Sequence, residues 1–312
     1  MSSSDSVYAA CAYTLGEALL ARMDALLSRL DARWPPPPAA PDWSVVIACR
    51  WKKRAEGQGF FAPVHQIHPL RLADLTGIDA QKARIVANTR QFLEGRPANN
   101  VLLTGTRGSG KSSLVKALLN EFAEAGLRLI EVDRDDLADL ADIIDRIAGH
   151  PEKFLVFCDD LSFESGENTY RTLKSALDGS IAAPPENTLI YATSNRRHMV
   201  PEYFVDNLET TRADNGEIHP GEAIEEKVSL SERFGLWISF YPFDQENYLA
   251  IVARWLYTFG FSAKEIATAE REALNWALAR GSRSGRVAWQ FARDYAGKAG
   301  KSGARRRTKS RK

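Results

Sequence analysis

The sequence has only three cysteines, Cys11, Cys49 and Cys158, in 312 residues. Their odd number and wide spacing fit neither a disulfide framework nor a cysteine-based zinc site. No run approaches the roughly 18 apolar residues of a membrane-spanning helix, and the first seven residues lack the basic start of a secretory signal. These absences predict a soluble, cytoplasmic protein with reduced thiols and no membrane partner.

Charge of one sign dominates only at the C-terminus. The chain has 41 Lys and Arg against 40 Asp and Glu, a net charge of +1. Residues 298–312 hold eight basic and no acidic residues, so the rest of the chain carries −7. Such a tail either contacts nucleic acid or an acidic protein surface, or is a disordered, solvated terminus. The basic residues are Lys298, Lys301, Arg305, Arg306, Arg307, Lys309, Arg311 and Lys312.

Residues 1–69 are expected to form a helical N-terminal extension and a linker. Apolar residues recur at helical spacing through residues 7–34, and the prolines at 35–38 end any helix there. We expect a short strand at 45–48 and then a loop marked by Gly57 and Gly59. Arg50, Lys52, Lys53 and Arg54 lie between them and form either a nucleic-acid contact or a solvated strand end.

Residues 70–242 show the alternating pattern of strands and helices that is typical of an α/β domain. Short, nearly unbroken apolar runs alternate with helical stretches, which is typical of parallel strands covered by helices on both faces. Residues 243–297 contain no strand candidate and are expected to form a helical lid. The expected strands are 101–103, 127–132, 154–158, 189–192 and 236–240, and the expected lid helices are 246–259, 263–280 and 285–296.

A phosphate-binding loop follows the first of these strands. The segment Gly105-Thr106-Arg107-Gly108-Ser109-Gly110-Lys111-Ser112 fits the pattern G-x-x-x-x-G-K-[ST]. Its glycines let backbone N–H groups turn inward as a nest for anions at a helix N-terminus. Lys111 would contact the β- and γ-phosphates of ATP, and the Ser112 hydroxyl would ligate Mg²⁺. We also assign Ser113, the next residue of the helix, to the nucleotide site.

Polar residues end two later apolar runs. Asp159 and Asp160 follow the strand at 154–158, as in a Walker B element. Asp159 would hold the Mg²⁺ shell, and Asp160 would activate the water that attacks the γ-phosphate. A helix cap is the alternative interpretation of this pair. Asn195 follows the strand at 189–192 and would hydrogen-bond water or the γ-phosphate.

In this order, the elements resemble the AAA+ ATPase superfamily from about Leu72 to Tyr295. The resemblance implies a P-loop NTPase fold, a three-layer parallel sheet with a C-terminal helical lid, working as a homo-oligomer. It also implies an adenine contact at Gly77 and Ile78. Arg233 would be an arginine finger for a neighbouring subunit's γ-phosphate. Arg286, at the start of a lid helix, would act on the subunit's own nucleotide.

Several stretches look more narrowly like an uncharacterised bacterial AAA+ ATP-binding family. They include residues 77–82, 88–92, 97–103, 159–164 and 233–243. One position departs from the superfamily, in which Asp-Glu is usual where this chain has Asp159-Asp160. The shorter side chain predicts slow hydrolysis, a closer backbone, or a contribution from Glu164.

These features predict an ATP-binding protein, a slow Mg²⁺-dependent ATPase that acts as an oligomeric switch on an unknown protein client. An alternative is an ATP-gated adaptor or loader that hardly hydrolyses and binds protein or DNA. A small-molecule kinase would leave Asn195, Arg233 and the helical lid unexplained. The charged insertion at 206–227, with His219 among carboxylates, is either a partner or metal site or a solvated loop between subunits.

Overall fold

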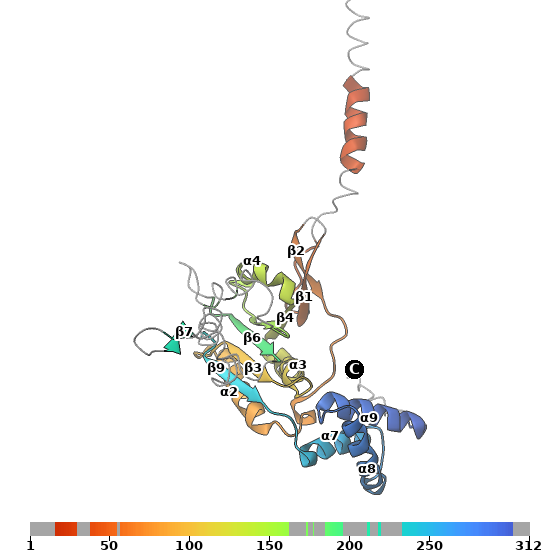
Figure 1. The fold of residues 1–312 in the computed structure, drawn as a ribbon. Coiled ribbons are helices and arrows are strands. Elements are labelled where there is room, and N and C mark those ends of the chain that lie inside the picture. The colour runs from red at the N-terminus through yellow and green to blue at the C-terminus, as the bar shows by residue number, and fades with distance from the viewer. Residues whose placement is uncertain are drawn as a thin grey trace, which may run out of the picture.

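The computed structural model describes residues 16–29, 38–54, 57–161, 173, 177, 185–195, 211–212, 218–219 and 233–301. Within these residues a seven-stranded sheet forms the centre, with helices on both faces and a helical domain at one end (Figure 1). The strand order is β2-β1-β4-β5-β6-β3-β9. The strands are β1 (Ala48–Lys53), β2 (Gly59–Pro63), β3 (Val101–Gly105), β4 (Leu127–Val132), β5 (Lys153–Cys158), β6 (Thr188–Ser194) and β9 (Leu236–Phe240).

Strands β4, β5, β6, β3 and β9 are mutually parallel and supply most of the buried sheet. Parallel strands covered on both faces need continuous apolar runs, and these sequences provide them. β3 lies between β6 and β9, while the chain leaves β3 for β4, three places away. The strand order therefore reverses beside β3, where open α/β sheets bind ligands at the carboxyl ends of their strands.

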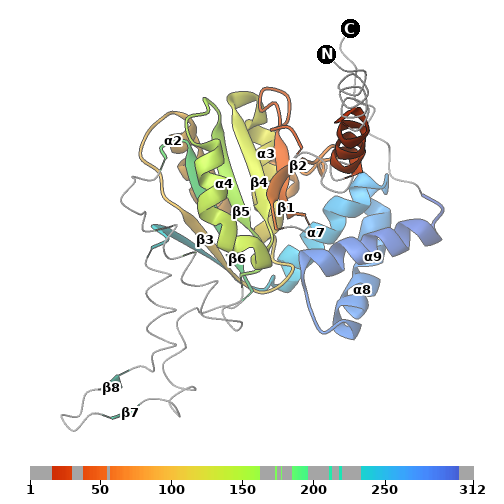
Figure 2. The same ribbon diagram turned by 90° about the horizontal axis from the view of Figure 1, so that it is seen from above.

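Two hydrophobic cores lie on opposite faces of the sheet. One contains residues of α2 (Asp79–Leu93) and α3 (Lys111–Phe122). The other contains Leu140, Ile143 and Ile147 of α4 (Leu140–Ile147), which follows the 3₁₀ helix η3 (Arg134–Asp139). Figure 2 shows α4 on the opposite side of the sheet from α2 and α3. The three-layer α/β fold predicted from the sequence is therefore confirmed.

The C-terminal helices form the predicted lid. They are α7 (Gln245–Thr258), α8 (Ala263–Ala279) and α9 (Gly285–Lys298). Each begins at a side-chain cap, because Asp244, Ser262 and Ser284 each accept a hydrogen bond from a backbone N–H of the first turn. Since the caps are local in sequence, the lid boundaries could be predicted to within two residues.

The structure corrects the expected N-terminal linker. β1 and β2 form an antiparallel hairpin, and β1 pairs in parallel with β4, so the sheet already begins at residue 48. Gly59, which is expected from the sequence to mark a loop, starts β2. A Cβ there would lie 1.9 Å from the ring of Trp51, so the strand needs a glycine beside this indole. As a division into folding units, our boundaries after residues 69, 242 and 297 stay predictions.

The basic cluster on β1 is partly neutralised by acidic residues. Arg50 contacts Glu131 of β4 at 2.6 Å. Lys53 lies 2.9 Å from Asp139 and 3.4 Å from Asp136, both in η3. Arg50, Lys52 and Lys53 therefore lie within β1 itself and not after a strand at 45–48.

Residues 16–29 form a helix, as the apolar spacing predicted, and every residue in it is exposed. Figure 1 shows this helix apart from the sheet and the lid. In the insertion at 206–227 the structure describes a two-stranded ladder, β7 (Thr211–Arg212) with β8 (Ile218–His219). The basic residues beyond Lys301 lie outside the described residues. Among the helices described, none has the length and apolar character needed to cross a membrane.

Candidate nucleotide-binding site

The phosphate loop connects the end of β3 to the start of α3. Gly105, Gly108 and Gly110 have φ values of 131°, 76° and 101°, which glycine adopts far more readily than other residues. A Cβ on Gly105 would lie 1.9 Å from the carbonyl oxygen of Phe240 in β9. The neighbouring strand therefore requires a glycine here, and the loop delivers its amides to the N-terminus of α3, where the helix dipole favours anions.

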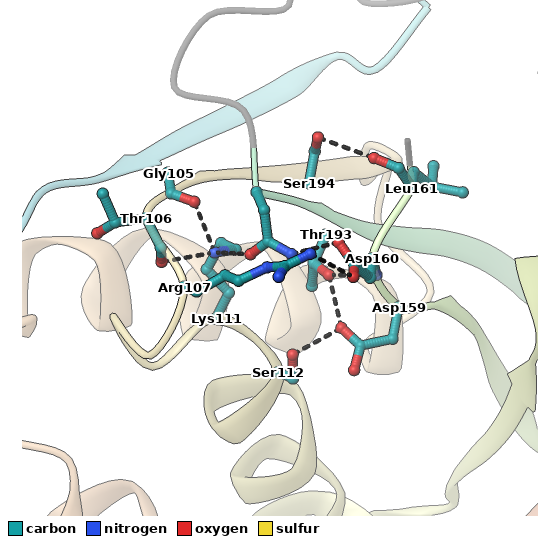
Figure 3. A network of polar contacts seen from close by, with 11 residues as sticks. Gly105, Thr106, Arg107, Lys111, Ser112, Asp159, Asp160, Leu161, Thr193 and Ser194 are labelled. Atoms are coloured by element: carbon teal, nitrogen blue, oxygen red, sulfur yellow. Dashed lines mark hydrogen bonds and ion pairs between the residues drawn. The ribbon is translucent and has the colours of Figure 1, made fainter. Parts of the chain in front are cut away.

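Lys111 points into this loop and is 5% exposed. Its Nζ donates to the carbonyl oxygens of Gly105 at 2.8 Å and Thr106 at 2.9 Å (Figure 3). It also donates to Oδ1 of Asn195 at 3.1 Å. Burial lowers the pKa of Lys111 from 10.5 to about 8, and the charges of Asp159 and Asp160 oppose this shift. The ammonium is thus held where it can donate hydrogen bonds to a phosphate.

Asp159 lies between the loop and β6. Its Oδ1 accepts hydrogen bonds from the hydroxyls of Ser112 and Thr193, both at 2.6 Å. Mg²⁺ prefers oxygen ligands and is usually held by one or two protein groups together with water and substrate phosphates. In the part of the chain that the structure describes, no group of three His, Cys, Asp or Glu could hold a metal by itself. Ser112 and Asp159 fit the partial, oxygen-only set that Mg²⁺ accepts.

Asp160 is the only residue other than glycine with positive φ in the described residues, at 56°. Its backbone N–H donates to Oγ1 of Thr193 at 2.9 Å, and its carboxylate accepts a hydrogen bond from Nδ2 of Asn195. Arg107 Nη2 lies 3.7 Å from the same carboxylate in a solvent-exposed ion pair. The left-handed turn lets adjacent residues Asp159 and Asp160 face one site, which a regular strand would not allow.

Thr193 is the site residue that sequence reasoning missed. It is 2% exposed, and its single hydroxyl contacts both Asp159 and Asp160. The ladder pairs Cys158 with Ala192, so Thr193 comes next in register, beside the two carboxylates. The only signal in the sequence was a hydroxyl residue two places before Asn195, and its meaning depends on which strands are neighbours.

A cavity of about 1600 Å³ extends from the phosphate loop to the lid. Ser113 lines it beside the loop, and Ile78 lines it on the side of α2, whereas Gly77 does not. A Cβ on Gly77, whose φ is 75°, would lie 2.9 Å from Asn247 of the lid, so this glycine permits close packing. Thr76 Oγ1 is buried without a hydrogen-bond partner. The apolar part of the cavity is lined by Leu75, Ile78, Phe243, Ile251, Trp255 and Trp289.

A family model described as "Protein of unknown function (DUF815)" matches residues 44–299. This chain belongs to that family. No curated protein matches it. Solved structures that resemble it include the RuvB Holliday junction branch migration motor of Thermotoga maritima, at 12% identity and a TM-score of 0.40, covering 73% of this chain and 72% of that one. Two variants of this RuvB give TM-scores of 0.42 and 0.43 at the same identity.

In this DUF815 protein, Arg286 lies at the start of α9 and lines the cavity, while its action on the nucleotide stays a prediction. The lid also contacts the phosphate loop directly, because Gly285 donates its backbone N–H to the carbonyl of Gly108 at 2.8 Å. A second link joins lid to core, where Arg254 of α7 contacts Asp74 at 2.7 Å. The lid is thus anchored on two sides of the cavity.

Arg233 lies at the other end of the sheet. It precedes β9, and the ladder pairs Leu236 with Val101 and Phe240 with Gly105. Arg233 is therefore at the amino ends of the strands, and a five-residue strand spans about 16 Å. Arg233 does not line the cavity described above. Other candidates named from the sequence, Glu164 and most of the 206–227 insertion, lie outside the described residues.

Proposed function

We propose that this protein binds ATP with Mg²⁺ and hydrolyses it slowly, as a homo-oligomeric switch acting on an unknown protein client. One observation carries the proposal: the groups needed for nucleotide chemistry meet at the carboxyl ends of three neighbouring strands. Lys111 follows β3, Asp159 and Asp160 follow β5, and Asn195 follows β6.

The phosphate end of ATP would occupy the loop from Gly105 to Ser112, with the amides of the loop and Lys111 as hydrogen-bond donors. Ser112 and Asp159 would hold Mg²⁺, which neutralises charge on the phosphates when bound. The base of ATP would enter the apolar part of the cavity, where Thr76 Oγ1 offers a buried hydroxyl. Lys111 is already close to this arrangement, because burial and three hydrogen bonds hold its ammonium group.

Hydrolysis would use Asp160 as general base. Its carboxylate would take a proton from the attacking water while the water oxygen bonds to the γ-phosphorus. The bond from that phosphorus to the bridging oxygen breaks, and ADP leaves with the electron pair. Asn195 and Arg107 contact this same carboxylate. Both contacts, together with the short side chain, support slow turnover.

The contact between the lid and the phosphate loop, together with the position of Arg233, supports a function as a nucleotide-driven switch. The hydrogen bond between Gly285 and Gly108 joins α9 to the phosphate loop, so movement of the loop reaches the lid. Arg286 would contact the phosphates of its own subunit. Arg233 is too far from its own cavity, so a role in hydrolysis places it against the nucleotide of a neighbouring copy. An oligomer follows from that role. We place the protein in the cytoplasm, which agrees with the free thiols of Cys49 and Cys158.

The test is complementation between two defective subunits. Lys111→Ala should abolish ATP binding, and Arg233→Ala should remove turnover while nucleotide affinity stays within a fewfold. Mixed together, they should regain part of the ATPase activity, because an intact Arg233 can then act on an intact phosphate loop. Light scattering with and without a non-hydrolysable ATP analogue shows whether oligomers form. Full activity of monomeric Arg233→Ala protein would refute the role in trans.

A second candidate function is an ATP-gated adaptor or loader that hardly hydrolyses. The contacts of Asp160 with Asn195 and Arg107 favour it, because they occupy the carboxylate that should activate water. The basic residues at 298–312 would then supply a nucleic-acid contact. DNA binding that weakens steeply with salt and disappears when this segment is deleted would support this candidate. ATP turnover that requires Asp160, without DNA binding, would exclude it.

A further inference from the structure

The helix at residues 16–29 carries an apolar face that no described part of the body covers. Its five large apolar side chains are each more than half exposed to solvent. An isolated helix of this length is marginal in water, and most helices gain stability by packing an apolar face. The helix also lies outside the residues 44–299 that the family model matches. The five side chains are Leu19, Leu20, Met23, Leu26 and Leu27.

The apolar residues of this helix have the sequence spacing that is typical of helices packed side by side. At 100° per residue they span an arc of about 120°, the width of the stripe with which a helix packs into a bundle. Leu26 and Leu27 repeat Leu19 and Leu20 after seven residues. A seven-residue repeat keeps the same stripe facing a partner helix along its length.

The charged residues border the stripe asymmetrically. By the same geometry, Glu17 and Asp24 lie about 110° from the centre of the stripe on one side. Arg22 and Arg29 lie about 110° away on the other side. One border of the helix is therefore acidic and the other is basic.

This asymmetry makes the helix complementary to a copy of itself in one orientation. When two such helices pack in parallel, the acidic border of each lies on the same side of the pair as the basic border of the other, where long side chains of opposite charge can meet. In an antiparallel pair, acidic faces acidic and basic faces basic. The charges thus favour parallel association and oppose the antiparallel one.

We propose that residues 16–29 are a self-association element, in which this helix packs in parallel with the same helix of other copies of the chain. Two heptads form a weak contact by themselves. Tethering to bodies that associate, as the proposed function expects, raises the effective concentration of the helices and strengthens the contact. The pairing gathers the N-termini of the subunits on one side of the assembly. It does not depend on nucleotide.

Sedimentation velocity of the full chain without nucleotide tests the proposal. The wild-type mass should rise above the monomer's 34.7 kDa with increasing concentration. The double variant Leu20→Glu/Leu27→Glu should weaken this association at least tenfold. The matched control is Tyr257→Glu/Leu278→Glu, which replaces two lid residues that are even more exposed and should change nothing. Association that is not weakened in the helix variant, or that is weakened equally in the control, would overturn the proposal.

Reversing both charged borders tests the orientation. A chain with Glu17→Lys, Arg22→Glu, Asp24→Lys and Arg29→Glu keeps a complementary pattern and should associate with itself as the wild type does. In parallel pairing it should not co-purify with tagged wild-type protein, because like charges then face each other. If the charge-reversed chain associates more strongly with the wild-type chain than with other copies of itself, the helices pair antiparallel, which contradicts the proposal.

The main competing occupant is a membrane surface, since an amphipathic helix can also lie on lipid. Flotation with vesicles of anionic phospholipid separates the two. A wild-type chain that stays monomeric up to about 100 µM and floats with the vesicles would overturn self-association. Because none of these measurements uses ATP, a failure of the proposed nucleotide chemistry would not affect their outcome.

Discussion

Thr193 Oγ1 accepts a hydrogen bond from the backbone N–H of Asp160 at 2.9 Å. This contact joins the end of β6 to the left-handed turn after β5, where φ of Asp160 is 56°. The same hydroxyl donates a hydrogen bond to Oδ1 of Asp159 at 2.6 Å. One buried side chain therefore sets the position of both carboxylates, and its removal should affect metal binding and turnover together.

We expect Thr193→Val to lower ATP turnover by about ten- to a hundredfold. Valine keeps the shape but loses both hydrogen bonds, so Asp159 and Asp160 are less well positioned. The Mg²⁺ concentration needed for half-maximal activity should also rise. Steady-state kinetics across a Mg²⁺ series measure both effects.

Two further variants separate positioning from damage to the fold. Thr193→Ser keeps the hydroxyl and should restore most of the activity. Thr89→Val removes another buried hydroxyl with two hydrogen bonds, to Ile85 and Tyr191, away from the site. It should leave the Mg²⁺ dependence unchanged. Equal Mg²⁺ dependence in Thr193→Val and wild type would contradict the role of Thr193.

The pKa of Lys111, lowered to about 8 by burial, predicts a pH dependence of ATP affinity. Phosphate binding favours the ammonium form, so affinity should fall as pH rises through 8, to roughly one tenth between pH 7 and pH 9. Binding above pH 8 should take up a proton. Titration calorimetry in buffers of different ionisation enthalpy measures that uptake.

The same pKa has a defined effect on the stability of the empty protein. Between pH 8 and the ordinary lysine value, the unfolded chain binds a proton that the folded chain has released. The contribution of Lys111 to the free energy of unfolding therefore rises with pH in this window.

ATP affinity that stays constant from pH 7 to pH 9 would contradict both predictions, because it would show that Lys111 stays charged without ATP.

We expect Asp160→Asn to bind ATP within a fewfold of the wild type and to lose turnover by a factor of about 10² or more. Asparagine tolerates left-handed backbone, so the turn should persist while the general base is removed. Asp160→Glu should instead lower the free energy of unfolding by about 1 kcal/mol, because glutamate is disfavoured in this conformation. Single-turnover assays and denaturant titration measure these effects, and unchanged turnover in Asp160→Asn would exclude Asp160 as base.

Gly105→Ala should destabilise the fold by more than about 3 kcal/mol. The new Cβ would meet the carbonyl oxygen of Phe240 at 1.9 Å, so β3 and β9 would have to separate. The control is Gly149→Ala, which also has positive φ, 79°, but open space around the new Cβ. It should cost only about 1 kcal/mol. Equal losses in urea titrations would show that the contact with β9 does not matter.

The predictable parts of the fold were those whose signals are local. The five core strands could be recognised because each is a short, nearly continuous apolar run, and the lid helices because their caps lie beside them in sequence. β1 and β2 were misjudged because Lys52, Lys53 and Gly59 resemble a loop. Their strand character depends on acidic partners in η3 and on the Trp51 ring, which are tertiary contacts.

By itself, the sequence determined the phosphate loop and the residue types proposed to bind Mg²⁺ and activate water, because glycine conformation and the chemistry of lysine and carboxylates act within a few residues. Only the tertiary structure decided which strand ends meet. The neighbouring positions of β5 and β6 give Thr193 its contacts with the Asp159 carboxylate and the Asp160 backbone N–H, and the register of β9 puts Arg233 far from its own cavity. Both depend on strand order, which is set by packing between residues distant in sequence.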